Sequence, residues 1–236
     1  MRGLGYSEAD AETLADHFLD AERRRKRGHG LVRVERLHER HAIDPSARPE
    51  RLVAEPEFER WHGRGALGYL TLAAVCDAQL ANPPRRARLA VAAPCFPTGV
   101  LGYWTRRLAA GGLVAVLTAT SPRRLGSLEG GPPLAGTNPL SIAVPSSDGR
   151  PLVTDVSMGR VTFGDVLAGA ATDDDLVPFG GEQAHKAFAL AVGLQVLVDA
   201  LAGGDEFGAL LVVARPEADP VPALRAVARG VRLPGD

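Results

Sequence analysis

Apolar residues recur at helical spacing in several stretches of the chain. Behind Ser7, which with Asp10 resembles a capping box, the positions of Leu14 and Phe18 predict an amphipathic helix that ends near Arg25. A long apolar stretch rich in Ala, Leu and Val predicts a further helix that is mostly buried. The helices expected after the first cover residues 31–41, 67–81, 102–110 and 185–202, and the Pro-rich segment 44–56 is expected to be an extended connector.

Short apolar runs between these helices have the length and composition of buried strands. They cover residues 89–93, 113–118, 141–145, 152–155 and 209–214. The third and fourth runs are joined by Ser146-Ser147-Asp148-Gly149, whose Asp-Gly pair is typical of a hairpin tip. Because helices and strands alternate irregularly, the pattern predicts an α/β or α+β fold with a mixed sheet.

Composition narrows the class of protein. The chain has 236 residues, 45% of them hydrophobic, and a net charge of -1, so we expect a globular protein without electrostatic attraction to nucleic acid or anionic membranes. The basic runs 23–27 and 85–86 are expected to be solvated surface. We expect no membrane span, which needs about 20 apolar residues, and no signal peptide. Two cysteines, Cys76 and Cys95, favour a reducing, cytoplasmic setting.

The first motif that can carry chemistry surrounds His29. Two glycines flank this histidine just before an expected helix, so its imidazole has little steric cover and can exchange a proton near neutral pH. Arg33 follows four residues later, about one helical turn away, and can bind a carboxylate through two hydrogen bonds. An exposed histidine in a turn between helices would show the same pattern.

Two further motifs offer groups to a ligand. The turn Gly136-Thr137-Asn138 presents backbone N–H groups, a hydroxyl and an amide, and Asp155 at the end of the next strand can orient a histidine. Gly180-Gly181 precedes His185-Lys186 at a helix start, where N–H groups and a cation favour an anion. An ordinary hairpin turn and an ordinary helix entry are the structural alternatives. The chain contains no G-x-G-x-x-G, P-loop or metal-binding cluster of His or Cys.

Taken in order, these motifs resemble the second type of the malate/L-lactate dehydrogenase family, which is unrelated to the Rossmann dehydrogenases. The segments that carry the resemblance are Gly28-His29-Gly30-Leu31-Val32-Arg33, Gly136-Thr137-Asn138-Pro139-Leu140, Leu152-Val153-Thr154-Asp155, Gly180-Gly181 with His185-Lys186, and Leu233-Pro234-Gly235. The resemblance implies reduction of a 2-oxo acid or a cyclic imino acid with NADPH or NADH. It also implies a small carboxylate substrate and a homodimer.

The resemblance assigns roles to individual residues. His29 would protonate the carbonyl or imine as hydride arrives, Arg33 would bind the substrate carboxylate, and Asp155 would lie near the nicotinamide and tune the proton donor. The residues that would bind the cofactor are Gly136, Thr137, Asn138, Pro139, Thr118, Ser121, His185 and Lys186. We expect an N-terminal helical segment over 1–60, a central dinucleotide-binding-like α/β domain over 61–215, and a tail over 216–236 that packs back on the N-terminal part.

The chain departs from the family pattern at several positions. Pro97 stands where the family has a second active-site histidine, Gly28 replaces a serine, and Asp165 replaces a lysine close to where cofactor phosphates would lie. Met158-Gly159 replaces a Thr-Ser pair, Ala187 replaces a glycine, and the family's long segment is shortened between 164 and 176.

These departures leave alternatives open. The cofactor site could be lost, in which case the chain would be an acid/base enzyme for isomerisation, elimination or cyclisation, or a non-catalytic remnant that binds a ligand or partner. Cys95 lies in the loop that lost its histidine, and whether it takes over that role is open. An iminium substrate already carries its proton, so the loss of one acid makes an imine slightly more plausible than a ketone.

Overall fold

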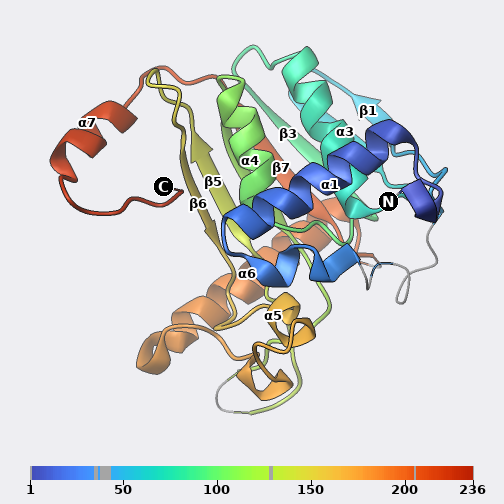
Figure 1. Ribbon diagram of the computed structural model, residues 1–236, viewed down its shortest axis with the longest axis vertical. Coiled ribbons are helices and arrows are strands. Elements are labelled where there is room, and N and C mark those ends of the chain that lie inside the picture. Colours follow the sequence, from blue (N-terminus) through green and yellow to red (C-terminus); the bar gives the residue numbers. More distant parts are fainter. Residues whose placement is uncertain (1, 35–36, 38–43, 128–129, 205, 236) are drawn as a thin grey trace.

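Figure 1 shows the computed structural model of the protein, which describes residues 2–34, 37, 44–127, 130–204 and 206–235. Its strands form one seven-stranded sheet in the order β1-β2-β3-β7-β4-β5-β6. They are β1 (Glu50–Ala54), β2 (Phe58–His62), β3 (Ala87–Ala92), β4 (Val114–Ala119), β5 (Leu140–Val144), β6 (Leu152–Val156) and β7 (Ala209–Ala214). Strands β2 and β3 pair in parallel and all other neighbours are antiparallel, so the expected mixed sheet is confirmed.

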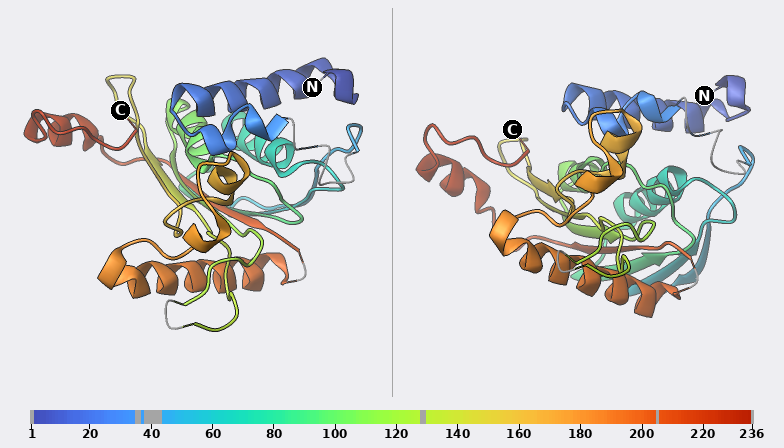
Figure 2. Two further views of the ribbon diagram at one scale, coloured as in Figure 1. Left: turned by 60° about the horizontal axis from the view of Figure 1, so that its bottom comes forward. Right: turned by 90° about the horizontal axis from the view of Figure 1, so that it is seen from below.

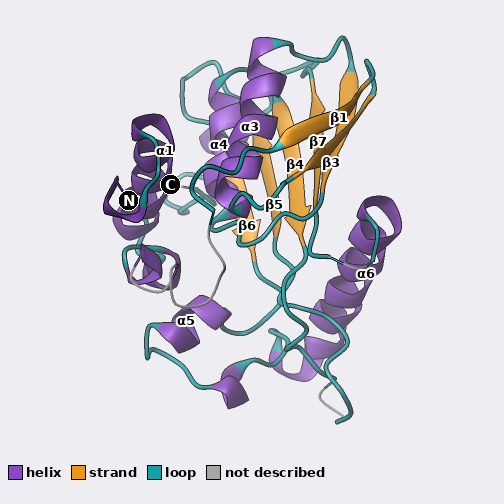
Figure 3. Cartoon of the chain, turned by 90° about the vertical axis from the view of Figure 1, so that its right-hand side faces the viewer, coloured by secondary structure: helices purple, strands orange, loops and turns teal. Residues whose placement is uncertain are grey.

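Helices cover both faces of this sheet. Figure 3 shows α1 (Glu8–Arg23), α3 (Gly68–Ala81) and α4 (Leu101–Ala110) on one side and α6 (Ala184–Ala202) on the other. In Figure 2, α1 lies outermost, over α3 and α4. The main core fills the space between this helix layer and the central strands, whose apolar runs are buried on both faces.

The first helix begins and ends where the chain's local chemistry directs it. Ser7 caps α1, because its Oγ accepts the Asp10 N–H at 3.2 Å and donates to the Asp10 carboxylate at 2.6 Å. After Arg23 the chain turns through Arg25, which has a left-handed φ of 59°. The short 3-10 helix η2 (Arg27–His29) follows. Residues 32–34 and 37 continue the helical segment expected over 31–41, and the rest of that expectation lies outside the described residues.

The segment expected to be a connector contains strand β1, and β2 follows it directly. Both escaped the sequence pattern because charged residues leave only short apolar runs in them. Glu59 of β2 is almost fully buried, and it accepts hydrogen bonds from Trp61 Nε1 and Gln79 Nε2, each at 2.9 Å. Arg88 pairs with the same carboxylate at 3.4 Å. Compensation by distant partners therefore allows a carboxylate in the sheet core.

Helix α6 is less buried than its composition suggested. Its small residues Ala184, Ala187 and Ala191 face the protein, whereas Leu190, Val196 and Leu197 are 51%, 60% and 44% exposed. The helical stretch Gly181–Ala202 is also long and apolar enough to cross a membrane, with 28% of its apolar window buried in the protein. This corrects the expectation that no stretch of the chain reaches that length. Helices of a soluble core meet the same criterion.

The expected boundary at residue 60 falls inside β2, so the sheet joins the two sides of it. The main core likewise contains residues from α1 and from the central strands. Helix α7 (Val221–Val227) lies apart from the sheet, beyond the β5–β6 hairpin (Figure 1). The chain then returns, and Arg24 Nη1 at the end of α1 donates to the Gly235 carbonyl at 3.3 Å.

Candidate active site

A cavity of about 630 Å³ brings together segments that are far apart in the sequence. Its walls come from the η2 turn, the loop 96–101, residues 120–124 after β4, the turn before β5, the end of β6, and α5 (Phe163–Leu167). His29, Arg33 and Asp155 all line it. Its size is typical of sites for small molecules, and it has both apolar walls and convergent polar groups.

Glycine at position 28 explains how the His29 turn is held. A Cβ there would lie 2.6 Å from the Gly164 carbonyl carbon and 2.7 Å from the Asp165 nitrogen, so the helix α5 packs directly against this turn. Asp165 and Thr162 form a capping box at the N-terminus of α5, because Asp165 Oδ2 accepts hydrogen bonds from the N–H and the hydroxyl of Thr162, each at 2.8 Å. The serine of the family pattern would not fit without moving α5.

The imidazole of His29 is half-buried and neutral at physiological pH. Burial lowers its pKa to about 3, and the charges of Arg33, His17 and Lys26 act in the same direction. Its Nδ1 is buried and has no hydrogen-bond partner among the described residues. A neutral ring has one donor and one acceptor nitrogen, so His29 retains hydrogen-bonding capacity for a ligand in the cavity.

Arg33 is oriented by the same turn. Its Nε donates to the Gly28 carbonyl at 3.0 Å, which fixes the plane of the guanidinium. Within the described part of the chain, the two terminal amino groups have no recorded partner and remain able to bind a carboxylate in the fork geometry.

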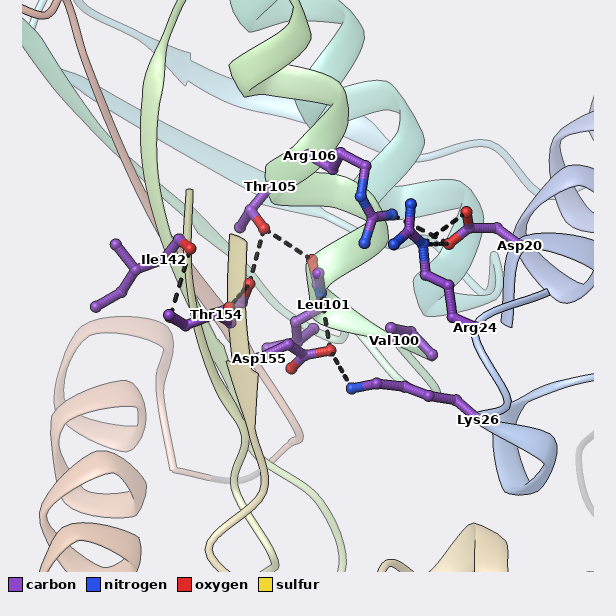
Figure 4. A network of polar contacts seen from close by, with 12 residues as sticks. Asp20, Arg24, Lys26, Val100, Leu101, Thr105, Arg106, Ile142, Thr154 and Asp155 are labelled. Carbon is purple, nitrogen blue, oxygen red and sulfur yellow. Dashed lines mark hydrogen bonds and ion pairs between the residues drawn. The ribbon is translucent and has the colours of Figure 1, made fainter. Parts of the chain in front are cut away.

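Asp155 lies at the end of β6, between the first turn of α4 and Lys26 (Figure 4). Its Oδ2 accepts the Gly102 N–H at 3.1 Å and the Lys26 ammonium at 3.0 Å. A helix N-terminus favours such a carboxylate. We expected Asp155 to tune the proton donor His29. In the described contacts, Asp155 is instead bound by Lys26, which precedes His29 by three residues.

The predicted cofactor-binding residues divide into two groups. Thr137, Pro139 and Ser121 line the cavity. Gly136, Asn138, Thr118, His185 and Lys186 are not among its lining residues. His185 and Lys186 lie exposed at the start of α6.

Asn138 has a structural role that the sequence pattern did not indicate. Its side chain is fully buried, with Nδ2 donating to the Ala191 carbonyl and to Gln195 Oε1, each at 3.0 Å. Its Oδ1 accepts the Ser121 N–H at 3.3 Å. The expectation that this amide faces a ligand is therefore corrected, because its hydrogen bonds fasten the turn to α6.

Gly136 and Thr118 support the same turn from behind. A Cβ on Gly136 would lie 2.3 Å from Ser121 Oγ, and Thr118 Oγ1 donates to the Pro139 carbonyl at 2.9 Å. Both residues act on the cavity through Ser121 and Pro139, which line it.

Three residues near the cavity were not found from the sequence. Tyr69 lines it and is fully buried; burial raises the pKa of Tyr69 to about 12, and its hydroxyl has no partner among the described residues. His17 is also fully buried, and its Nε2 accepts the Val100 N–H at 3.0 Å, which fixes the cavity loop. Lys26 belongs to a basic run that was expected to be solvated. The position of Lys26, three residues before His29, was the one feature of the sequence that could have indicated a role at the cavity.

In the loop where the family has its second active-site histidine, neither Pro97 nor Cys95 offers a proton donor to the cavity. Pro97 lines the cavity with a side chain that cannot transfer a proton. Cys95 is fully buried in the main core, its Sγ lies 3.7 Å from the Gly68 carbonyl oxygen, and burial raises the pKa of its thiol. It is not among the cavity's lining residues, so its thiol does not line the cavity in this structure. The described residues also hold no group of three side chains suited to a metal ion.

Comparison with known proteins agrees with this architecture. The chain is 30% identical to a (2R)-3-sulfolactate dehydrogenase (NADP(+)) of Chromohalobacter salexigens over 71% of its own length, and spans about half (51%) of that protein. It is 28% identical to a Δ(1)-pyrroline-2-carboxylate reductase of Pseudomonas fluorescens over 84% of its length and 67% of the relative's.

Solved structures show the same fold over nearly the whole chain. A dehydrogenase of Sinorhizobium meliloti superposes with a TM-score of 0.80 at 25% identity, covering 98% of this chain and 84% of that one. A Δ1-piperideine-2-carboxylate reductase of Pseudomonas syringae pv. tomato gives 0.82 at 23% identity, covering 98% and 86%. The family model described as malate/L-lactate dehydrogenase matches residues 1–176, well over half of the chain. The chain therefore belongs to the malate/L-lactate dehydrogenase family.

Proposed function

We propose that the protein is an NAD(P)H-dependent reductase of a small 2-oxo acid or cyclic imino acid, with the imino acid favoured. The observation that carries this proposal is the convergence of His29, Arg33 and Asp155 on one cavity, although Asp155 is more than a hundred residues from the other two in the sequence. The relatives named as a sulfolactate dehydrogenase and a pyrroline-2-carboxylate reductase carry small carboxylates in their names, which supports the same class of substrate here.

The cavity has features that suit a nicotinamide next to a carboxylate. Ser121, Pro122, Thr137 and Pro139 form one wall, with apolar ring surface beside hydroxyl groups. The buried, unpartnered Tyr69 hydroxyl would gain a hydrogen bond from a bound molecule that reached it. A bound nicotinamide would supply the hydride. Arg33 would hold the substrate carboxylate through its two terminal amino groups, which have no recorded partner among the described residues.

The protonation state of His29 bears on the choice of substrate. Burial lowers the pKa of His29, so its imidazole carries no extra proton at pH 7, and Pro97 stands where the family has a second histidine that could act as an acid on a ketone. A protonated cyclic imine needs no such acid, and the neutral ring can accept a hydrogen bond from the iminium N–H. This favours the imino acid over the 2-oxo acid.

Nucleotide titration and two variants test the proposal. The protein should bind NADPH or NADH and reduce Δ1-piperideine-2-carboxylate or Δ1-pyrroline-2-carboxylate, followed by loss of absorbance of the reduced nicotinamide. Arg33→Gln should raise KM about 10- to 100-fold while nucleotide binding persists, because a charged hydrogen-bond pair is lost. Arg27→Gln, on the same turn but exposed, is the control. Absence of binding of either nucleotide at millimolar concentration would exclude the redox function.

The protein is also proposed to form a homodimer in the cytoplasm. The exposed apolar residues Leu190, Val196 and Leu197 of α6 support a second copy of the chain as the partner that covers them. The cytoplasmic setting rests on the two cysteines, which are both free and buried.

A further inference from the structure

The end of helix α1 places Lys26 at a fixed point of the backbone. Arg25 is in the left-handed conformation, and its N–H donates to the Glu22 carbonyl at 2.9 Å. The Lys26 N–H donates to the Ala21 carbonyl at 2.8 Å. These two hydrogen bonds form a Schellman motif, a frequent way for a helix to end. The position of Lys26 is therefore set by the closed end of α1.

The backbone of Lys26 also supports the turn that carries the candidate catalytic side chains. Its carbonyl accepts the His29 N–H at 2.9 Å within η2. Arg33 is attached to the same turn, because its Nε donates to the Gly28 carbonyl at 3.0 Å. A movement of Lys26 would therefore displace His29 and Arg33 together.

The side chain of Lys26 reaches across to the sheet. Its Nζ lies 3.0 Å from Asp155 Oδ2 at the end of β6 (Figure 4). Asp155 is itself held, since its Oδ2 accepts the Gly102 N–H at 3.1 Å. A Cβ on Gly102 would lie 3.0 Å from the Asp155 Cβ, so the first turn of α4 packs directly on this side chain. Lys26 thus has a rigid partner.

This ion pair differs from the solvated pairs of the chain in its burial and in its place. The side chain of Asp155 is 12% exposed and that of Lys26 is 39% exposed. In contrast, Arg86 and Glu217 pair through side chains that are 82% and 81% exposed. Solvated pairs contribute little because water and salt screen them. Lys26 and Asp155 both line the cavity, as His29 does.

The other contacts around the turn leave this link to the sheet to Lys26. The charge of Asp155 also acts on Arg106, but the guanidinium of Arg106 is bound to Asp20 at 3.1 Å. On its other side the turn meets α5 by packing, and no backbone hydrogen bond between Gly28 and α5 is recorded among the described residues. The Lys26–Asp155 pair is therefore the recorded polar link between the His29 turn and β6.

We propose that Lys26 is a positioning residue, which ties the His29 turn to the end of β6 through Asp155. The proposal rests on the proposed function for the reaction that His29 and Arg33 serve. Lys26 keeps these two side chains at the cavity wall, and Asp155 acts on them through Lys26.

Amide hydrogen exchange tests this attachment without any ligand. The His29 N–H should exchange about 10-fold faster in Lys26→Met, which keeps an unbranched side chain and removes its charge. Asp155→Ala should have the same effect, and the double variant should exchange no faster than either single one, because all three lose one and the same contact. Arg27→Met removes a cation from the exposed next residue of the turn, and as the matched control it should leave the exchange unchanged.

Ligand binding and turnover test whether the attachment matters to the site. The probe is pyrrole-2-carboxylate, an aromatic analogue of the proposed imino acid that has no reducible C=N bond. Lys26→Met should weaken its binding and lower kcat about 10-fold each while NADPH binding persists, because Arg33 and His29 are displaced together. Lys26→Arg should restore most of both, since a guanidinium can also pair with Asp155. The urea midpoint of Lys26→Met should stay close to that of the parent, because a partly exposed ion pair adds little stability.

The possible failures are distinguishable. Unchanged exchange at His29 in Lys26→Met would overturn the proposal. Faster exchange with unchanged analogue binding and kcat would also overturn it, because Lys26 would then be a structural residue only. If the parent reduces no imino acid, the proposed function fails, while exchange and the binding of pyrrole-2-carboxylate still decide the role of Lys26. A parent that also binds no pyrrole-2-carboxylate would remove both proposals.

Discussion

Two imidazoles, the buried His17 and the half-buried His29, link the cavity to the stability of the fold. Burial lowers the pKa of His17 to about 4 and that of His29 to about 3, because the interior disfavours the charged ring. The unfolded chain takes up these protons near the ordinary imidazole pKa of about 6.5. The stabilisation is therefore fully present above that pH and is lost as the pH falls toward the folded pKa values.

We predict that the folded protein loses stability as the pH falls, and that the titration of His17 accounts for a measurable share of this loss. From pH 8 to pH 5 the free energy of unfolding should fall by about 2 kcal/mol through His17 alone. In His17→Gln this share should disappear, since glutamine does not titrate and can still accept the Val100 N–H. Urea unfolding at the two pH values measures it, with the exposed His185→Gln as the control. An unchanged pH dependence in His17→Gln would contradict the assignment.

At the scale of elements, the packing of α5 on the η2 turn closes the site on one side. The contact is between backbones, since a Cβ on Gly164 would lie 2.2 Å from the Gly28 carbonyl oxygen. It depends on glycine at both positions, and it places Phe163 and Asp165 in the cavity wall. The Arg124 guanidinium lies 3.9 Å from the centroid of the Phe163 ring, which holds α5 to the loop after β4.

Alanine substitution at two glycines should therefore have opposite effects. Gly28→Ala should destabilise the protein by about 1–3 kcal/mol, because the new methyl group overlaps α5. Gly193→Ala should stabilise a single copy of the chain by about 1 kcal/mol, because Gly193 is exposed within α6 and a Cβ there meets nothing within 4 Å in the same copy. Urea denaturation measures both changes. A Gly28→Ala protein as stable as the parent would show that α5 does not pack as described.

At the scale of the whole molecule, the two faces of the sheet are covered unequally. The face under α1, α3 and α4 holds the main core, whereas α6 crosses the other face (Figure 2). Helix α6 leaves the large apolar side chains of Leu190, Val196 and Leu197 exposed. An exposed apolar row of this kind marks an interface, and the proposed homodimer would cover it.

We expect the parent protein to sediment as a dimer and Val196→Glu to sediment as a monomer. The charge would be placed in the centre of the proposed interface, where it has no partner. Val227→Glu on α7 makes the same change at a side chain that is 87% exposed and outside α6, and should remain dimeric. A monomeric parent would exclude the dimer. Co-sedimentation of the parent with lipid vesicles that Val196→Glu abolishes would assign the face to a membrane instead.

Elements held by interactions between residues close in the sequence could be predicted, whereas features that depend on distant residues could not. The helix behind Ser7, the strands of the hairpin around Asp148-Gly149 and the apolar strand β7 were predicted to within a few residues, because capping, turn chemistry and periodicity are local. Strand β1 was missed because its apolar run is only three residues long and charged residues flank it, although its partner β2 follows directly. The buried Glu59 was missed because Gln79 and Arg88, which compensate it, lie elsewhere in the chain.

The sequence by itself determined the local elements, the mixed α/β class, and the motifs that indicate the family. Only the tertiary structure decided that Lys26 and not His29 pairs with Asp155, that Asn138 fastens a turn to α6, and that the basic run 23–27 lies beside the end of β6 and the C-terminal tail. Each of these depends on burial and on distances between residues far apart in the chain. Those quantities come into existence only when the chain folds.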